Sequence, residues 1–470
     1  MNRLANLYGT LLVLLWFLVA YGANASDDSV SVNVMGPLIL TDETQWQSFS
    51  VDLDAAKEVG VQAISIDVWW GLVEKDRDQE FDWRYYDRLF DLVLSKGLRL
   101  VPIMSFHQCG GNVGDECNIP IPDWIWNTEG PLKPNDLKYM SEQGNLSGEY
   151  VSLWADHIAV KQYREFMLAF EHHFASLKDD IDELNISMGP AGELRYPSYN
   201  GHDKNTNYPT RGAFQSYGEV ATQDFQLWLK NKYRDIGRLN KSWSMTLASF
   251  EDVSQPKNMD HFVNSGQHIR SQYGQDFVAW YHDALIEHAA QVLQASHESF
   301  SKAFKNIDLG FKLPGIHWQM AAPDNLHRSA EMAAGLIDAG DNISHEEFAY
   351  GYLGIMELIN SFNFAEREII LHFTCLEMDD NPQAPAYSKA KSLVEWIANA
   401  AKSKGITLKG ENALAAGVQS DKGWSNISHV IQKGLYDGVT ILRLQFVSSG
   451  YGKEKLARFI QTQKGDKKIH

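Results

Sequence analysis

Apolar runs rich in β-branched residues alternate along the chain with segments of helical periodicity. Eight such runs are candidate strands: Val30–Val34, Ala63–Val68, Leu98–Met104, Leu184–Met188, Ile307–Leu313, Ile369–Thr374, Ile406–Leu408 and Gly438–Leu444. Between the second and third runs, Tyr86, Leu89, Phe90, Val93 and Leu94 recur every three or four residues, as on a helix face packed against a sheet. Strands alternating with helices predict a parallel sheet with crossover helices.

Eight strand–helix units close most naturally into a barrel. We therefore expect an α/β fold, a single (β/α)8 (TIM) barrel, which the 470-residue length allows. The alternative is an open doubly wound sheet. It is disfavoured because no Gly-x-Gly-x-x-Gly turn follows the first predicted strand.

Two connections are longer than a barrel requires. One follows the third predicted strand, residues 106–157, and the other follows the fourth, residues 189–272. Both contain many Trp, Tyr, Asn, Gly and Pro residues rather than low-complexity sequence, so we expect them to form a folded lobe over the barrel mouth. Long loops on one face of a barrel usually carry function.

The first 25 residues have the layout of an export signal. Arg3 precedes an apolar stretch, Leu11–Tyr21, and a small-residue site, Ala23–Ala25, stands before Ser26. We expect residues 1–25 to be removed, leaving 26–470 as the mature chain in the periplasm or outside the cell. A retained membrane anchor is the rival interpretation, but the stretch is short for a span.

Composition narrows the classes of partner. A formal net charge of −18 disfavours nucleic acid or an anionic membrane as the main partner and suits a neutral ligand. The chain has 14 Trp residues, more than packing usually requires, and such rings can stack on sugar faces. We expect a monomer that does not contact a membrane after signal cleavage.

Cys109 and Cys117 lie in one Gly-rich loop, whereas Cys375 lies far along the chain. In an oxidising compartment the first two are expected to pair, and two free thiols are the alternative. The cysteines show neither Cys-x-x-Cys nor Cys/His zinc spacing.

Two glutamates follow apolar runs in turn-forming surroundings. Glu193 lies among small residues in Gly189–Tyr199 (GPAGELRYPSY), and Glu411 lies in Gly410–Leu414 (GENAL). Both are therefore expected near the carboxyl ends of strands, where barrel enzymes place catalytic groups. Two carboxyls that flank one bond are the minimum equipment for hydrolysis of a glycosidic linkage.

Further motifs in the same order resemble the β-amylase family of glycoside hydrolases, over residues 34–446. They are Asp67–Gly71 (DVWWG), His107–Asp115 (HQCGGNVGD), Gly315–Trp318 (GIHW), Phe373–Met378 (FTCLEM) and Leu442–Arg443. The resemblance implies an exo-acting hydrolase that releases maltose from non-reducing ends of α-1,4-glucans with inversion. The residues after the last predicted strand, 445–470, are too few for an appended starch-binding domain.

By match to the family motifs, Glu193 is the general acid and Glu411 the general base, with Lys312 or Asn412 helping to keep Glu411 ionised. An inverting pair stands about 6.5–9.5 Å apart, which strands on opposite arcs of a barrel make reachable. Two other interpretations are a non-catalytic glucan-binding or sensing protein on the same fold, and a retaining or endo-acting hydrolase. No cofactor is required.

The resemblance also implies a set of substrate contacts. Asp67 would bind the outermost glucose, Asp115 would reach the reacting sugar from a lid formed by 110–115, and Thr374 would hold the leaving glucan or the catalytic water. The Cys109–Cys117 pair would bracket that lid. The complete set of expected substrate contacts is Asp67, His107, Asp115, Lys312, His317, Trp318, Thr374, Asn412, Ala413 and Arg443.

One oxygen-rich cluster resembles the calcium-binding segment of some bacterial β-amylases. Glu74, Asp78 and Gln79 follow the second predicted strand, and Glu165 is a further candidate ligand. Calcium takes six to eight oxygen ligands, and Gln162 stands where another carboxylate would be expected. Structural calcium is therefore an expectation that rests on an incomplete ligand set.

Overall fold

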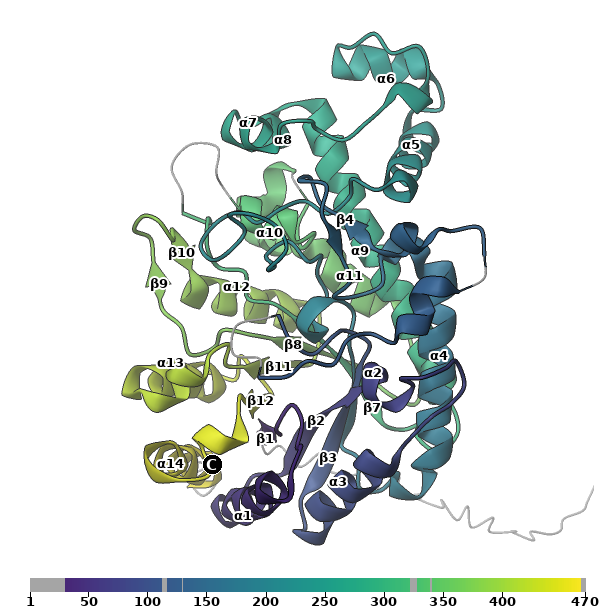
Figure 1. Ribbon diagram of the computed structural model, residues 1–470. Coiled ribbons are helices and arrows are strands. Elements are labelled where there is room, and N and C mark those ends of the chain that lie inside the picture. The colour runs from purple at the N-terminus through teal and green to yellow at the C-terminus, as the bar shows by residue number, and fades with distance from the viewer. Residues whose placement is uncertain (1–29, 112–115, 129, 322–327, 339, 466–470) are drawn as a thin grey trace, which may run out of the picture.

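Eight parallel strands form a closed barrel. A computed structural model describes residues 30–111, 116–128, 130–321, 328–338 and 340–465 (Figure 1). The barrel strands are β1 (Ser31–Met35), β2 (Ala63–Trp69), β3 (Arg99–Ser105), β6 (Glu183–Ile186), β7 (Asp308–Leu313), β8 (Ile369–Phe373), β11 (Leu408–Glu411) and β12 (Gly438–Ile441). The expected (β/α)8 barrel is confirmed.

Pairing between the first and last strands decides between the two candidate sheets. Around the barrel the order is β1-β12-β11-β8-β7-β6-β3-β2, and β1 pairs in parallel with both β12 and β2. An open doubly wound sheet would leave two edges unpaired. Two strand ends differ by three residues: the seventh strand continues to Glu411 instead of ending at Leu408, and the eighth ends at Ile441 instead of Leu444.

Helices cover the outside of the barrel and build the lobe. Around the barrel lie α1 (Glu43–Val59), α2 (Trp70–Val73), α3 (Arg84–Ser95), α4 (Asp156–His173), α9 (Gln272–Ser299), α10 (Ser329–Ala333), α11 (Leu353–Ser361), α12 (Ala390–Ser403), α13 (Asp421–Gln432) and α14 (Gly450–Gly465). Local sequence sets their ends. In α1, for example, the Asp42 side chain accepts a hydrogen bond from the Gln45 amide, and Gly60 ends the helix in a left-handed conformation.

The two long connections form a lobe, as expected. It contains the two-stranded sheet of β4 (Tyr139–Met140) and β5 (Leu146–Ser147) and the helices α5 (Glu219–Tyr233), α6 (Ile236–Trp243), α7 (Met259–Asn264) and α8 (Gln267–Arg270). Helices α5 to α8 stand at the top of Figure 1, away from the barrel strands. A second small sheet pairs β9 (Asp380–Asn381) with β10 (Ser388–Lys389).

A buried ionic cluster lies inside the barrel one layer below the end of β11. Glu183 accepts hydrogen bonds from His372 of β8 and from Lys409 of β11, with Lys409 Nζ 2.7 Å from Glu183 Oε2. Gly310 of β7 leaves the space for it, because an added Cβ would lie 2.1 Å from Glu183 Oε1. Lys409 and Glu411 are two residues apart and therefore project to the same side of β11.

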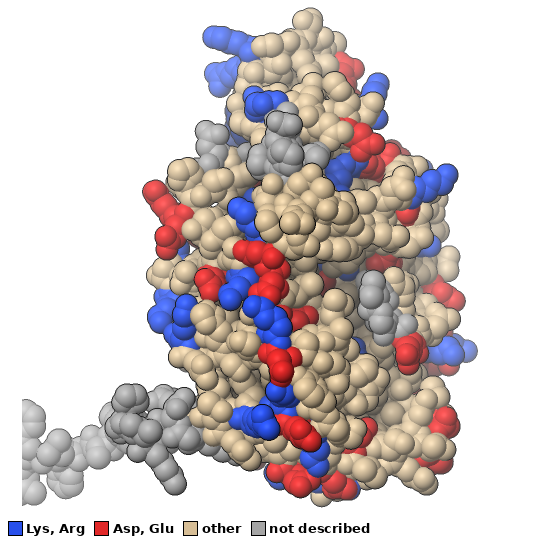
Figure 2. Space-filling model, turned by 90° about the vertical axis from the view of Figure 1, so that its left-hand side faces the viewer, with Lys and Arg blue, Asp and Glu red and all other residues tan. Residues whose placement is uncertain are grey.

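On the face shown in Figure 2, basic and acidic side chains are interspersed rather than gathered into one large basic patch. The segment expected to be an export signal lies outside the described residues. Within the described ranges, the helices include none that is long and apolar enough to cross a membrane.

Candidate active site

The two glutamates singled out in the sequence converge on one lysine. Glu411 is the last residue of β11, and its carboxylate accepts from Lys312 Nζ of β7 at 2.9 Å. Glu193 forms a parallel β-bridge with Lys312, and the Leu194 amide donates to the Lys312 carbonyl at 2.8 Å. Lys312 and Glu411 line a cavity together with Asp67, Gly192 and His372. The fold therefore gathers these side chains at the carboxyl ends of the barrel strands.

Glycines set the course of the chain that carries Glu193. An added Cβ at Gly189 would lie 2.5 Å from the carbonyl oxygens of both Glu193 and Arg195, and Gly192 has a φ of +76° beside the His107 ring. Only glycine fits both positions without displacing backbone. The turn thus places Gly192, the residue before Glu193, in the lining of the cavity.

A cation, rather than another carboxylate, is the nearest charged neighbour of Glu193. Arg195 Nε donates to Glu193 Oε2 at 2.9 Å, and the Tyr199 hydroxyl donates to the same oxygen at 3.2 Å. The Arg195 side chain is completely buried, and its guanidinium lies 4.0 Å from the centre of the Tyr199 ring. Sequence reasoning assigned no role to either residue, although both lie within six positions of Glu193.

The polar groups at the ends of β2 and β3 are tightly held. Asp67 is buried and accepts from the Ser105 hydroxyl at 2.7 Å. Burial raises the pKa of Asp67, against the opposing effects of that hydrogen bond, Arg443 and Lys312. His107 contacts the Ser187 hydroxyl at 2.8 Å.

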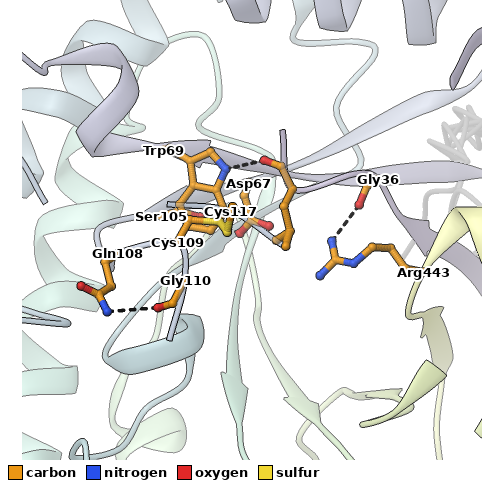
Figure 3. Close-up of a disulfide and its surroundings, with 10 residues drawn as sticks. Gly36, Asp67, Trp69, Ser105, Gln108, Cys109, Gly110, Cys117 and Arg443 are labelled. Carbon is orange, nitrogen blue, oxygen red and sulfur yellow. Dashed lines mark hydrogen bonds between the residues drawn. A yellow bond between two sulfur atoms is a disulfide. The ribbon is translucent and has the colours of Figure 1, made fainter. Parts of the chain in front are cut away.

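His107 and Arg443 complete this side of the site. Burial, with the positive charges of Lys312 and Arg195, lowers the pKa of His107 to about 3, so the ring is neutral near pH 7. Arg443 donates to the Gly36 carbonyl at 2.8 Å (Figure 3). The positive charge of Arg443 lowers the pKa of the Asp67 carboxyl, against the effect of burial.

A second group of site residues is an aromatic wall made by Tyr199, Tyr208 and Trp318. The ring centres of Tyr199 and Trp318 are 5.6 Å apart, and those of Tyr208 and Trp318 are 5.4 Å apart. Trp318 Nε1 donates to the Thr210 carbonyl and Gln319 Nε2 to the Pro209 carbonyl, at 2.6 and 2.8 Å, which fixes the segment carrying Tyr208. Tyr208 is 55% exposed. Sequence reasoning missed it because its loop carries no separate signal.

His317 adjoins the same wall. Its Nδ1 lies 2.7 Å from the Ser388 hydroxyl, and its ring centre lies 5.9 Å from that of Tyr208. Burial lowers the pKa of His317 to about 4, so this ring is also neutral near pH 7. The wall therefore presents uncharged rings.

Thr374 is held by the neighbouring loop after β7. Its hydroxyl accepts from the Gly315 amide at 2.7 Å. An added Cβ at Gly315 would lie 2.2 Å from the Cys375 sulfur, so glycine permits the two loops to approach this closely. In this conformation the Thr374 hydroxyl is bound to backbone.

The loop after Glu411 is fixed by two side chains. Asn412 donates to the Leu442 and Leu414 carbonyls and accepts from the Leu442 amide, so its side chain is committed to the backbone. Glu377 accepts from the amides of Ala413 and Leu414 at 3.0 and 2.8 Å. Glu377 is a further residue that the sequence did not single out for function.

The expected disulfide between Cys109 and Cys117 is present (Figure 3). Beside it, Cys109 and Ile119 exchange two backbone hydrogen bonds of 2.8 and 3.0 Å. Asp115 and most of the predicted lid lie outside the described residues.

The four candidate calcium ligands lie close together and are joined by hydrogen bonds. They are Glu74, Asp78, Gln79 and Glu165. The Gln79 amides donate to Glu74 Oε1 at 2.7 Å and to Glu165 Oε2 at 2.8 Å. With its amide nitrogen turned toward the carboxylates, Gln162 donates to Glu165 at 3.0 Å and to Asp78 at 3.1 Å. Among the described residues, no three His, Cys, Asp or Glu side chains are grouped closely enough to hold a metal ion. Structural calcium therefore stays a prediction, and in this structure the carboxylates are joined by amide donors.

A closed (β/α)8 barrel with a buried Glu411 and a partly buried Glu193 at the carboxyl ends of its strands is typical of barrel hydrolases that act on glycosidic bonds. Residues 33–468 match the sequence profile of glycosyl hydrolase family 14. The chain belongs to this family and is a glycoside hydrolase.

Several relatives cover most of the chain. A β-amylase of Bacillus cereus is 38% identical over 427 residues, 91% of this chain and 73% of the relative. A thermophilic β-amylase of Thermoanaerobacterium thermosulfurigenes is 38% identical over 443 residues, 93% of this chain and 75% of the relative.

Solved structures agree with these sequence matches. The catalytic domain of a Paenibacillus polymyxa β-amylase superposes with a TM-score of 0.81 at 35% identity, covering 93% of this chain and 98% of that domain. A β-galactosidase of a psychrophilic Marinomonas matches with a TM-score of 0.55 at 14% identity, which shows the fold alone.

Proposed function

We propose that this glycoside hydrolase is a β-amylase that hydrolyses α-1,4-glucosidic bonds of starch, glycogen or maltodextrins and releases maltose from non-reducing ends. The observation that carries the proposal is the convergence of Glu193 and Glu411 on Lys312: Glu411 through its carboxylate, with which Lys312 lines a cavity, and Glu193 through a backbone bridge. Two carboxyls at the carboxyl ends of different barrel strands, one of them held by a lysine, are the parts of a two-carboxyl hydrolase.

Glu193 is the proposed general acid. Arg195 and Tyr199 both donate to its Oε2, so that oxygen is an acceptor and the proton belongs on Oε1. In the reaction the Oε1 proton passes to the glycosidic oxygen as the bond from that oxygen to the anomeric carbon breaks. The leaving glucan then departs as a neutral alcohol.

Glu411 is the proposed general base. Lys312 contacts both of its oxygens, which favours the ionised carboxylate that a base requires. A water held by this carboxylate attacks the anomeric carbon from the face opposite the leaving oxygen, and Glu411 takes the proton of that water. One displacement on the far face gives the β-anomer of maltose. The reaction uses only water and these side chains and requires no cofactor.

The two sides of the site have different proposed roles. Asp67, His107 and Arg443 bind the hydroxyls of the non-reducing glucose, while His317, Trp318 and the rings beside them bind sugars beyond the cleaved bond. Asn412 and Ala413 contribute through their backbone, because the Asn412 side chain is already occupied. Thr374 binds substrate or water after its hydroxyl leaves the Gly315 amide, and Asp115 reaches the reacting sugar from the loop between the cysteines.

We also propose that residues 1–25 direct export and are removed, and that the mature chain, a single catalytic domain, acts as a monomer. The layout of Arg3, Leu11–Tyr21 and Ala23–Ala25 supports export. N-terminal sequencing of the protein recovered from the producing cell tests this, and an intact Met1 would contradict it.

The test of the proposed reaction is proton NMR of the sugar released from maltoheptaose during the first minutes. Maltose that appears first as the β-anomer supports exo-cleavage with inversion. The α-anomer, or products of mixed length, would indicate a retaining or endo-acting enzyme. Binding without any product would indicate a sensor on the same fold.

A further inference from the structure

The chain that leads from β6 to Glu193 is held by a helix on the outside of the barrel. β6 ends at Ile186, and two residues later the Met188 carbonyl accepts from Nε2 of His288 at 3.2 Å. His288 belongs to α9 and is 1% exposed. This buried hydrogen bond therefore ties α9 to the first peptide of the turn that carries Glu193.

The partners of the His288 ring define where its hydrogens lie. A carbonyl oxygen can only accept, so Nε2 carries a hydrogen and donates it to Met188. Nδ1 lies 2.9 Å from Oδ1 and 2.8 Å from Oδ2 of Asp156, so a second proton lies between this nitrogen and the carboxyl. Asp156 thus fixes the orientation of the ring, with Nε2 aimed at Met188.

Asp156 is held in turn by its own helix. It is the first residue of α4, where the helix dipole favours a carboxylate. Its side chain is 7% exposed and that of His288 is 1% exposed, so water hardly competes for the pair. Because α4 and α9 pack against each other, both partners come from neighbouring helices of the outer layer.

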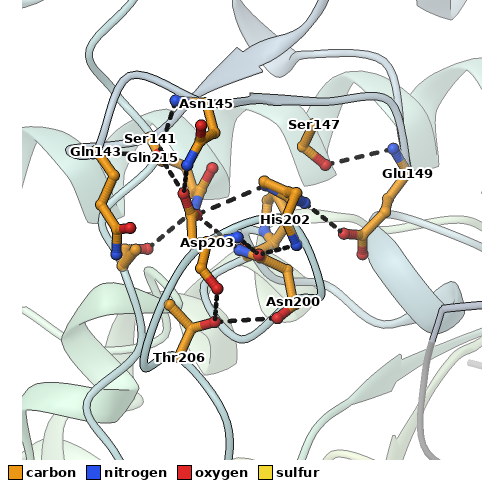
Figure 4. Close-up of polar contacts among 12 residues, drawn as sticks. Ser141, Gln143, Asn145, Ser147, Glu149, Asn200, His202, Asp203, Thr206 and Gln215 are labelled. Carbon is orange, nitrogen blue, oxygen red and sulfur yellow. Dashed lines mark hydrogen bonds and ion pairs between the residues drawn. The ribbon is translucent and has the colours of Figure 1, made fainter.

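A second side chain holds the preceding peptide. The Tyr150 hydroxyl donates to the Ser187 carbonyl at 3.3 Å, and its ring meets the His288 ring edge-on, with centres 5.7 Å apart. The segment that carries Tyr150 is itself fixed, because the Glu149 amide donates to the Ser147 hydroxyl at 3.3 Å (Figure 4). Two consecutive carbonyls before the turn are therefore held by side chains from other parts of the chain.

The position of the Met188–Gly189 peptide reaches Glu193 through close backbone packing. An added Cβ at Gly189 would lie 2.5 Å from the Glu193 carbonyl oxygen, and the Gly192 amide donates to the Gly189 carbonyl at 3.1 Å. Beyond the turn, Glu193 is bridged to Lys312. In a turn packed this tightly, a shift of the Met188–Gly189 peptide moves the backbone of Glu193.

We propose that His288 is a positioning residue for the catalytic acid: its hydrogen bond to Met188 sets the place of the turn that carries Glu193, and Asp156 orients His288. This inference rests on the proposed function, because it assumes that Glu193 is the acid. His288 acts through the backbone and does not contact the reacting atoms. Its loss leaves the acid present but misplaced, which slows proton transfer to the glycosidic oxygen.

The test compares two replacements of His288 in the full mature protein, with maltoheptaose as substrate. In His288→Gln the amide nitrogen can take the place of Nε2 and donate to Met188. The shorter side chain in His288→Asn can face Asp156 but does not reach Met188. We expect kcat to fall about tenfold or more in His288→Asn, with KM within about twofold, and to stay within about threefold of the wild type in His288→Gln.

A second substrate distinguishes the acid step from general damage. Fluoride leaves with little help from an acid, so turnover of α-maltosyl fluoride should change less than about twofold in His288→Asn. His282→Asn is the matched control, because His282 is buried on the same helix but its Nδ1 contacts the Gly335 carbonyl, at 2.8 Å. We expect the ratio of maltoheptaose turnover to fluoride turnover to be unchanged in this control.

Three results would overturn the inference: unchanged kcat on maltoheptaose in His288→Asn, an equal loss with both substrates, or an equal loss in His288→Asn and His288→Gln. If His288→Asn does not fold, Asp156→Asn replaces it. The ratio of maltoheptaose turnover to fluoride turnover should then fall by less, because His288 loses only the partner that orients it. An unchanged ratio there would also overturn the inference. Failure of the proposed function is seen separately, as wild-type activity in Glu193→Gln.

Discussion

Lys312 Nζ lies 2.8 Å from Oε2 and 2.9 Å from Oε1 of Glu411, so one cation holds both oxygens of the proposed base. Burial opposes the charge of Lys312, but the attraction of Glu411 and of the other carboxyls outweighs it and raises the pKa of Lys312. Because Glu193 is bridged to the backbone of the same lysine, Lys312 links the positions of both glutamates.

Loss of either proposed catalytic carboxyl should nearly abolish turnover. Glu193→Gln and Glu411→Gln each keep the shape of the side chain but remove the acid or the base, so we expect kcat on maltoheptaose to fall by about a hundredfold or more. Glu171→Gln is the matched control, since Glu171 is a buried residue of α4 that accepts from the Lys302 and Phe304 amides and does not line the cavity. Near wild-type turnover in either active-site variant would contradict the assignment.

The exposed ring of Tyr208 should contribute to binding beyond the cleaved bond. Tyr208→Ala removes one ring of the aromatic wall, and we expect a loss of about 1 kcal/mol of binding, seen as a roughly fivefold rise in KM for maltoheptaose with little change in kcat. Tyr451→Ala is the control, because Tyr451 is exposed but bonded to Asp421 on α13. Equal KM values for both variants would argue against this role.

The ionic cluster in the barrel should make stability depend on acidic pH. Burial disfavours ionised Glu183, but His372 and Lys409 outweigh burial and lower the pKa of Glu183 from 4.5 to about 2. A carboxyl with a lowered folded-state pKa adds stability above its unfolded value and loses it as the pH falls between about 4.5 and about 2.

Glu183→Gln should reduce the free energy of unfolding at pH 7 by about 3–5 kcal/mol, because it leaves Lys409 buried without its partner. We also expect the variant to lose less stability than the wild type between pH 5 and about pH 3. Urea unfolding at several pH values measures both quantities. Parallel pH dependence in the two proteins would show that the cluster is not responsible.

The Cys109–Cys117 disulfide should matter for catalysis more than for global folding. It closes a short loop, with a sequence separation of 8. A cross-link over so few residues lowers the entropy of the unfolded chain and stabilises the folded state by about 2–3 kcal/mol. We expect the double variant Cys109→Ser/Cys117→Ser to raise KM or lower kcat on maltoheptaose. Unchanged kinetics would remove the disulfide from the mechanism. Cys375→Ser is a control for the loss of a thiol. Its melting temperature is measured together with that of the double variant.

Chelation should not destabilise the protein. Gln79 and Gln162 donate to the carboxylates that would otherwise bind calcium, so those oxygens already have hydrogen-bond donors. We expect the melting temperature to be the same in excess EDTA and in millimolar calcium, as measured by calorimetry. A fall of several degrees in EDTA that calcium reverses would establish a calcium site.

The alternation of apolar runs with segments of helical periodicity was sufficient to predict the (β/α)8 barrel. Each of the eight apolar runs became a barrel strand, because a strand buried on both faces is largely apolar. The end of the seventh strand was less predictable. Lys409 and Glu411 are charged, and only their partners Glu183 and Lys312, on other strands, make them acceptable inside the barrel.

The sequence by itself therefore determined the barrel and the position of Glu193 and Glu411 at strand ends, since these depend on local pattern and motif order, and it favoured the pairing of Cys109 with Cys117 over two free thiols. Tertiary structure decided which charges meet: Lys312 with Glu411, Arg195 with Glu193, and the amides of Gln79 with the presumed metal ligands. Contacts of this kind join segments far apart in the chain, and their energies depend on distance and burial, which no local pattern records.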